Sequence, residues 1–263
     1  MAKMRFAILG AVALLAALAL PAAANDVIYS GIDTWRTPAD GSTFVDFSHE
    51  PLPAGFFCGK SAAFTGKVPF KGVPIVTEGG SLGPTDTIVE RLDDVTLDEN
   101  GVGTTRVQLR ALQFESIAPV KTACGKFNVR VHLDGEQPIT EMRIVKENET
   151  GGRFFAHIGL RARVIFTPVR GQARRPMEVV REVRFQPSSR APWSLRPSDK
   201  AVQRMGFVQV DTDADGTPDA FLPGTSNFAA GASMDKSIVY YVCHDDPNCG
   251  VHCQQVVGPT IEY

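Results

Sequence analysis

Polar and apolar residues alternate along several stretches of the chain, and this alternation predicts β-strands. It is clearest in residues 105–112 and 127–133, where apolar residues occupy every second position. A strand places successive side chains on opposite faces, so a period of two indicates one buried face and one wet face. Residues 154–169 form a further long extended stretch, and residues 178–185 alternate less cleanly.

Turn signals separate these stretches at intervals of eight to fifteen residues, a spacing that is typical of a sandwich. Residues 98–101 end in Asn-Gly, which tolerates the backbone angles of a tight hairpin turn. Asp134-Gly135 and residues 148–152 are similar signals. The chain contains 24 glycines and 18 prolines, which favours many turns over helices. We therefore predict an all-β fold with an antiparallel β-sandwich over residues 25–185.

Composition changes after this region. Residues 186–200 are rich in proline, serine and arginine, and we interpret them as a linker or an ordered loop. Residues 201–263 then form a C-terminal segment that carries an acidic loop and a cluster of cysteine and histidine residues.

The first 24 residues have the pattern of a secretory leader. Lys3 and Arg5 precede an apolar core, and Pro21-Ala22-Ala23-Ala24 supplies small residues for cleavage. We expect a secreted or periplasmic protein with no membrane span after removal of this signal peptide. The formal charge of −2 becomes −4 once Lys3 and Arg5 leave with the leader. A protein with this small negative net charge has no excess of basic residues for binding the phosphates of nucleic acid.

The chain has five cysteines, and an exported protein meets an oxidising compartment in which thiols form disulfides. We expect Cys58 to pair with Cys124 and one further bridge within the C-terminal three. Because the number is odd, at least one cysteine remains free, binds a metal or pairs between chains.

The acidic loop, residues 211–219, contains the most specific pattern in the sequence. Four aspartates stand at its positions 1, 3, 5 and 9, and a glycine at position 6 permits a sharp turn. Calcium prefers six to eight hard oxygen ligands, and alternate side chains of a curling backbone converge on one point. The predicted ligands are Asp211, Asp213, Asp215, Asp219 and the carbonyl of Thr217.

An EF-hand would complete this shell with a glutamate at position 12, where this chain has Leu222. The loop instead resembles the D-x-D-x-D-G-x-x-D calcium loops of thrombospondin type 3 repeats and of integrin-type β-hairpins. The resemblance covers about ten residues in a single copy, and it implies a calcium site with Asp219 closing the shell. The alternative is a solvated acidic turn without an ion.

A second cluster near the C-terminus offers thiol and imidazole ligands, which suit zinc or copper. Its members are Cys243, His244, Cys249, His252 and Cys253. Export favours the alternative interpretation, a loop closed by a disulfide.

Other candidate residues are more ambiguous. His132 and His157 each fall in a predicted strand and are either exposed histidines or a catalytic pair. The aromatic residues Trp35, Trp193 and Tyr240-Tyr241 are either core residues or a platform for stacking sugars.

Three functional hypotheses follow from these features. The leading one is a secreted, non-catalytic, calcium-binding structural or binding module with an unknown extracellular ligand, either a polysaccharide or a protein. The second is a secreted hydrolase or metal-dependent enzyme that uses the strand histidines or the C-terminal cluster with Zn²⁺ or Cu. The third is a carbohydrate-binding module.

Overall fold

The computed structural model describes residues 27–37, 39–78, 80–170, 175–187, 191–194, 207–224, 229–230, 239–246 and 250–257. Within these ranges all regular secondary structure is strand, and every strand pairing is antiparallel. The predicted all-β antiparallel fold is therefore confirmed. Across the same ranges no helix has the length and apolar character needed to cross a membrane. The predicted signal peptide, residues 1–24, lies outside the described residues.

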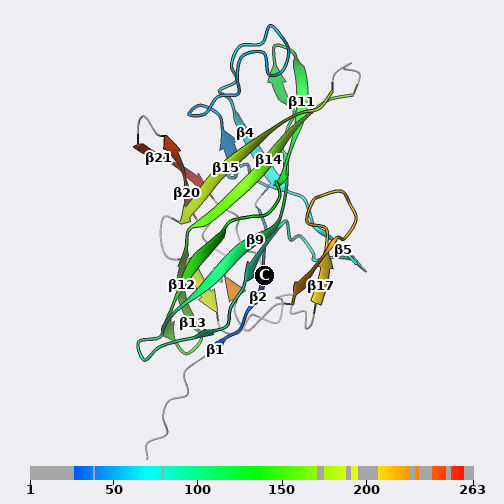
Figure 1. Cartoon of the computed structure of the whole chain (residues 1–263). Coiled ribbons are helices and arrows are strands. Elements are labelled where there is room, and N and C mark those ends of the chain that lie inside the picture. Colours follow the sequence, from blue (N-terminus) through cyan, green and yellow to red (C-terminus); the bar gives the residue numbers. More distant parts are fainter. Residues whose placement is uncertain are drawn as a thin grey trace, which may run out of the picture.

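One large sheet of 15 strands forms the body of the protein (Figure 1). In spatial order its main path is β19 (Ala229–Ala230), β16 (Ala191–Ser194), β13 (Gly151–Ala156), β12 (Ile139–Asn148), β9 (Val102–Ser116), β11 (Gly125–Leu133), β14 (Ile158–Pro168), β15 (Met177–Pro187), β20 (Val239–Asp246) and β21 (Gly250–Val257). Off this path lie β2 (Gly31–Trp35), β3 (Phe44–Asp46), β4 (Lys67–Gly72), β7 (Thr87–Arg91) and β10 (Val120–Thr122).

The strand β9, with 15 residues, joins the two ends of this sheet. Residues 102–112 of β9 pair with β12 and β7, and residues 113–116 pair with β11 and β4. The pairing of β7 with β9 shifts register between Ile88 and Val89, opposite Ala111 and Leu109 of β9. Such an irregularity bends the strand and increases its twist.

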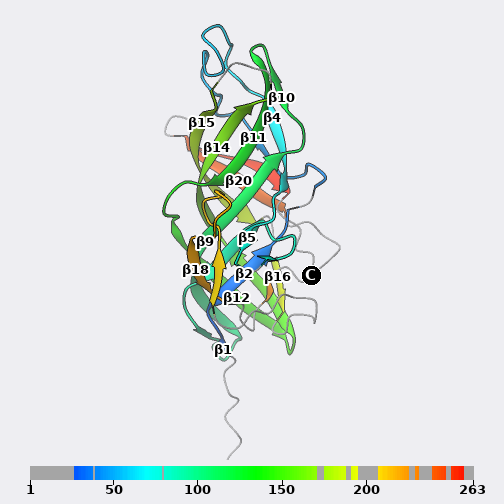
Figure 2. The ribbon, with the colours of Figure 1, turned by 90° about the vertical axis from the view of Figure 1, so that its right-hand side faces the viewer.

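Two small sheets complete the fold. One has four strands in the order β18 (Ala220–Pro223), β17 (Phe207–Val210), β5 (Val76–Thr77) and β6 (Gly80–Ser81). The other pairs β1 (Val27–Ile28) with β8 (Val95–Thr96). In Figures 1 and 2, β17 lies on one side of the large sheet and the β20–β21 hairpin lies on the other.

The sheet β2-β7-β9 is buried on both faces, because a separate hydrophobic core packs against each. Val89 and Leu112 belong to the larger core, whereas Ile88 and Ala111, their neighbours in sequence, belong to the smaller one. The smaller core packs the four-stranded sheet against β2, β7 and β9. Its buried members are Ile32, Ile75, Leu82, Ile88, Ala111, Val208, Val210 and Leu222.

The larger core ends in a cluster of phenylalanines beside a disulfide. Phe57 contacts Phe127 and Phe166 at ring-centroid distances of 5.0 and 5.2 Å. The adjacent Cys58 forms a disulfide with Cys124, 66 residues away in sequence. The predicted pairing of these two cysteines is thereby confirmed.

A buried carboxylate connects three segments near the smaller core. Asp86 accepts hydrogen bonds from the Thr37 backbone N–H at 2.6 Å, the Thr37 hydroxyl at 3.0 Å and the Thr87 hydroxyl at 2.7 Å. A Cβ atom on Gly72 would overlap the Asp86 carboxylate, so only glycine leaves room for it. Burial raises the pKa of Asp86 to about 6, despite these hydrogen bonds and the nearby Arg36.

Segments that the composition separates are joined by strand pairing. Ala191–Ser194, within the predicted linker or ordered loop, is β16 and pairs with β13. From the predicted C-terminal segment, β17 pairs with β5 and β20 pairs with β15. Residues 201–263 therefore contribute strands to sheets that begin in residues 25–185. Residues 186 and 187 of the predicted linker are the end of β15, and residues 188–190 and 195–200 lie outside the described residues.

Candidate metal centre

The acidic loop, residues 211–219, connects β17 to β18 as the turn of a hairpin. Val208 and Val210 of β17 and Leu222 of β18 point into the smaller core, with 5%, 0% and 1% of their surfaces exposed. The alternation of the two strands therefore fixes where the loop begins and ends. Position 12 of the pattern is the buried Leu222, which belongs to the hairpin core and supplies no ligand.

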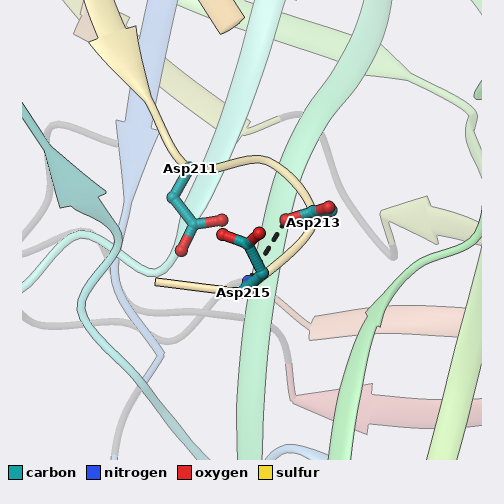
Figure 3. Close-up of side chains that lie close together, drawn as sticks. All are labelled: Asp211, Asp213 and Asp215. Carbon is teal, nitrogen blue, oxygen red and sulfur yellow. Dashed lines mark hydrogen bonds between the residues drawn. The ribbon is translucent and has the colours of Figure 1, made fainter. Parts of the chain in front are cut away.

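Three of the predicted ligands converge on one point. One carboxylate oxygen from each of Asp211, Asp213 and Asp215 lies within 4.8 Å of the others (Figure 3). Asp211 is buried, whereas Asp213 and Asp215 are exposed to solvent. Three carboxylates at this separation repel one another in the absence of a cation, and together they can bind a metal ion.

Asp211 holds the loop in its curled form. One of its carboxylate oxygens accepts a hydrogen bond from the Ala214 N–H at 2.8 Å, and the other accepts one from the Gly216 N–H at 2.9 Å. Asp211, the first of the predicted ligands, therefore also holds the loop backbone at residues 214 and 216. Asp211 is also only 1% exposed, so its surroundings restrain the carboxylate within the folded loop.

The backbone of the loop turns sharply at two residues. Ala214 has a φ of +66° and Gly216 a φ of +93°, both in the region that favours glycine. Asp213 accepts a hydrogen bond from the Asp215 N–H at 3.1 Å, and Asp215 accepts one from the Thr217 N–H at 2.6 Å. The side chain of each exposed aspartate thus bonds to the backbone N–H two residues later. These hydrogen bonds turn the chain around the converging carboxylates.

Asp219 makes a different set of contacts. Its carboxylate accepts hydrogen bonds from the Thr212 N–H at 2.8 Å and from the Thr212 hydroxyl at 2.9 Å. Asp219 therefore closes the base of the loop and is absent from the described group of converging carboxylates. The Thr217 N–H contacts Asp215, and no described contact involves the Thr217 carbonyl.

The loop is anchored on two neighbouring strands. The Asp211 N–H donates to the carbonyl of Val76 at 2.9 Å, beside the short pairing of β17 with β5. On β9, the buried Gln113 donates from Nε2 to the carbonyl of Asp211 at 3.1 Å. The sequence pattern does not identify Val76 or Gln113, because neither has a recognisable spacing from the aspartates.

The two strand histidines do not form a catalytic pair. His132 lies opposite Arg163 in the pairing of β11 with β14. His157 immediately precedes β14, six residues before Arg163, a separation of about 20 Å along an extended strand. Burial lowers the pKa of His132, and Arg163 lowers it further, whereas Asp213 opposes them. His157 packs its ring against Phe155 at 4.6 Å.

Trp35 and Trp193 are core residues, so the alternative interpretation of these two tryptophans as a platform for stacking sugars is wrong. Trp35 and Trp193 are only 4% and 2% exposed and belong to the larger core. The Trp193 indole donates to the carbonyls of Val145 and Arg153, each at 3.2 Å. The side chains of Tyr240 and Tyr241 lie outside the described part of the structure.

Four of the five residues of the predicted Cys/His cluster belong to β20 and β21. Four of its members occupy the paired part of this hairpin, where Cys243 is opposite Cys253 and His244 is opposite His252. Cys249 lies outside the described residues, as do the side chains of the other four.

No protein family, characterised protein or solved structure matches this chain.

Proposed function

We propose that this protein is an exported, non-catalytic, calcium-binding β module in which one ion orders the turn between β17 and β18. The convergence of the Asp211, Asp213 and Asp215 carboxylates within 4.8 Å carries this proposal. Oxygen donors at this density suit a hard cation, and calcium accepts the irregular geometry of a loop more readily than magnesium does.

The arrangement of the loop supports an ordering role for the ion. Asp211 is fixed by two backbone N–H groups, so a ligand already stands in place before the exposed Asp213 and Asp215 engage the ion. Binding then relieves the repulsion between the carboxylates and restrains the turn. Completing a calcium shell of six to eight oxygens requires carbonyls or water beside these three side chains.

The expected energetic effect of this ion is local. Extracellular calcium modules have a Kd of roughly 10⁻⁴–10⁻³ M. At about tenfold excess calcium, binding linkage contributes about 1.4 kcal/mol to the free energy of unfolding. That amount orders a turn but does not hold together a fold whose large core is independent of the loop.

Thermal unfolding with calcium and with chelator tests this proposal. For a chain of this size, we expect calcium to raise the Tm by about 3–6 °C. Asp215→Ala removes one exposed ligand and should abolish the rise. Asp40→Ala is the matched control, because Asp40 is another exposed aspartate whose carboxylate accepts a hydrogen bond from a backbone N–H two residues later, that of Ser42 at 2.8 Å. A Tm that calcium leaves unchanged in the unaltered protein would refute the proposed function.

The extracellular partner, a polysaccharide or a protein, stays a prediction. The exposed Phe207 and Phe221 lie on the wet face of the β17–β18 hairpin, 76% and 68% exposed. They are diagonal neighbours on this face, because Phe221 lies opposite Gln209, two residues after Phe207 on β17. A ligand screen with and without calcium can therefore compare the variants Phe207→Ala and Phe221→Ala with the unaltered protein.

A further inference from the structure

The outward face of the four-stranded sheet carries exposed apolar side chains. Phe207 of β17 and Phe221 of β18 are 76% and 68% exposed, more than any other large hydrophobic side chain among the described residues. Val76 of β5 shares this face, because its neighbour Thr77 points inward opposite the buried Val210. We call Phe207, Phe221 and Val76 the apolar face. Exposed apolar groups gathered on one side of a sheet are typical of an interaction surface.

The charges of this sheet are all of one sign. Residues 73–86 and 207–224 supply its four strands, and they contain six acidic residues but no lysine, arginine or histidine. Four of the acidic residues are exposed and form what we call the acidic rim: Glu78, Asp213, Asp215 and Asp219. A surface of one sign attracts partners of the opposite sign and repels partners of its own.

Two residues of the acidic rim lie beside the apolar face. The Glu78 N–H donates to the carbonyl of Gln209 at 3.3 Å, and Gln209 lies opposite Phe221. Glu78, Gln209 and Phe221 therefore follow one another in a row across the sheet. Asp219 lies two residues before Phe221 in sequence. An apolar centre bordered by charged groups has the pattern of a protein interface with a polar rim.

We propose that the apolar face is a docking surface for a protein segment with two alternate apolar side chains flanked by lysine or arginine. Alternate residues of an extended segment are about 7 Å apart. Diagonal neighbours such as Phe207 and Phe221 are separated by about 7–8 Å, so the two spacings match. The apolar side chains of the segment cover the two rings, and its flanking cations meet the acidic rim.

Other occupants fit these charges less well. A second copy of the chain would bring two acidic rims together, because a twofold interface uses the same face of both partners. An anionic polysaccharide or lipid surface is repelled by the exposed carboxylates, and a neutral polysaccharide gains nothing from them.

This inference identifies the chemistry of a partner, and it rests on the proposed function only in that the module binds rather than catalyses. It does not require calcium. Measurements in chelator therefore test the docking surface separately from the calcium site. Peptide binding in chelator, together with a Tm that calcium leaves unchanged, would refute the calcium proposal and support the docking surface.

Fluorescence anisotropy with a designed peptide tests this surface. The probe is the labelled peptide Lys-Lys-Phe-Ser-Phe-Lys-Lys, titrated with the full chain in chelator. We expect saturable binding that weakens at least about fivefold between ionic strengths of about 0.01 M and 0.15 M, because salt screens the charges of the rim. The peptides Glu-Glu-Phe-Ser-Phe-Glu-Glu and Lys-Lys-Ser-Ser-Ser-Lys-Lys should each bind at least about tenfold more weakly.

Variants of the two rings locate the binding surface. The double variant Phe207→Ala/Phe221→Ala should bind the probe at least about tenfold more weakly, because exposed aromatic anchors supply much of the affinity of such a surface. Ile139→Ala is the matched control, because Ile139 is 49% exposed but lies on β12. It should bind the probe like the unaltered protein.

Three results would overturn the proposal. The first is the absence of saturable binding of the probe, and the second is equal affinity for all three peptides. The third is unchanged affinity in the double variant. If the double variant instead lost binding to a neutral glucan that the unaltered protein binds in place of the probe, the face would be assigned to a polysaccharide.

Discussion

Gln113 donates a hydrogen bond from Nε2 to the carbonyl oxygen of Asp211, 3.1 Å away, and so links β9 to the first proposed ligand of the acidic loop. The two residues are 98 positions apart in sequence. Both are buried, with 7% and 1% of their surfaces exposed. The loop is therefore held by the large sheet as well as by its own hairpin.

Replacing Gln113 with leucine should weaken calcium binding. The substitution leaves the buried Asp211 carbonyl without this donor, at a cost of about 1–3 kcal/mol in the free energy of unfolding. The loop also loses part of its preorganisation, so binding must order it at greater entropic cost. Calorimetry of Gln113→Leu should show a several-fold higher Kd for calcium.

Gln108→Leu separates this effect from general destabilisation. Gln108 is equally buried on β9, and its Nε2 donates to the carbonyl of Gln137 at 2.7 Å, away from the loop. We expect a similar loss of stability in urea unfolding with an unchanged calcium Kd. Equal calcium affinity in both glutamine variants would show that the Gln113 contact does not support the site.

Asp211 and Asp213 should respond differently to alanine substitution. Asp211→Ala removes the acceptor of two backbone N–H groups, so we expect a loss of about 1–3 kcal/mol even in chelator. Asp213→Ala removes an exposed carboxylate and should leave stability in chelator nearly unchanged. Both variants should lose the calcium-dependent rise in Tm. Similar stabilities of the two variants in chelator would contradict a structural role for Asp211.

The backbone angles of the loop predict opposite effects at two positions. Ala214 adopts a φ of +66°, which costs a residue with a Cβ about 1–2 kcal/mol. Ala214→Gly should therefore stabilise the protein by up to about 1 kcal/mol, after the added freedom of the unfolded chain is subtracted. Gly216→Ala, at a φ of +93°, should destabilise it by more than about 1 kcal/mol.

Urea unfolding of the two variants in chelator measures both effects. No heavy atom outside its chain neighbours lies within 4 Å of a Cβ built on Gly216, so a loss of stability there reports backbone strain rather than a steric clash. A stabilising Gly216→Ala substitution would be inconsistent with this loop conformation.

Asp86 should make the protein more stable in mild acid. Burial raises its pKa from 3.8 to about 6, so the folded state binds the proton more tightly than the unfolded state does. This contribution is complete below about pH 4 and is lost as the pH rises through about 6. The shift corresponds to about 3 kcal/mol in the free energy of unfolding.

Urea unfolding between pH 4 and pH 7 measures this dependence. Asp86→Asn cannot titrate and should flatten the pH profile, whatever its absolute stability. Asp94→Asn is the control, because a hydrogen bond from the Ser30 N–H lowers the pKa of Asp94 and moves its effect below this window. Parallel profiles for Asp86→Asn and the unaltered protein would refute the assignment.

Features that depend on local spacing could be predicted from the sequence. The alternation in residues 127–133 matches β11, in which Phe127, Val129 and Val131 are buried between more exposed neighbours. The acidic pattern places three aspartates together because Gly216 and the short separations allow one turn to gather them. The separations of two and four residues are short enough for a single turn to bring these three side chains together.

Features that depend on strand order required the tertiary structure. Trp35 could be a surface or a core residue from its sequence alone, and only the packing of β2 against the larger core buries it. Asp86 resembles any other aspartate beside a turn until Thr37 and Gly72, remote in sequence, enclose it. Desolvation, and with it the raised pKa, arises only from that enclosure.

The sequence by itself determined the class of fold and the convergence of Asp211, Asp213 and Asp215, because both follow from residue type and short-range geometry. It also allowed the Cys58–Cys124 pairing to be predicted, although the two cysteines are 66 positions apart. The tertiary structure decided that Gln113 anchors the loop, that Leu222 faces the core, and that Asp219 bonds to Thr212. These outcomes depend on which strands become neighbours. That choice minimises the exposed apolar surface of the whole chain, and no short stretch of sequence contains it.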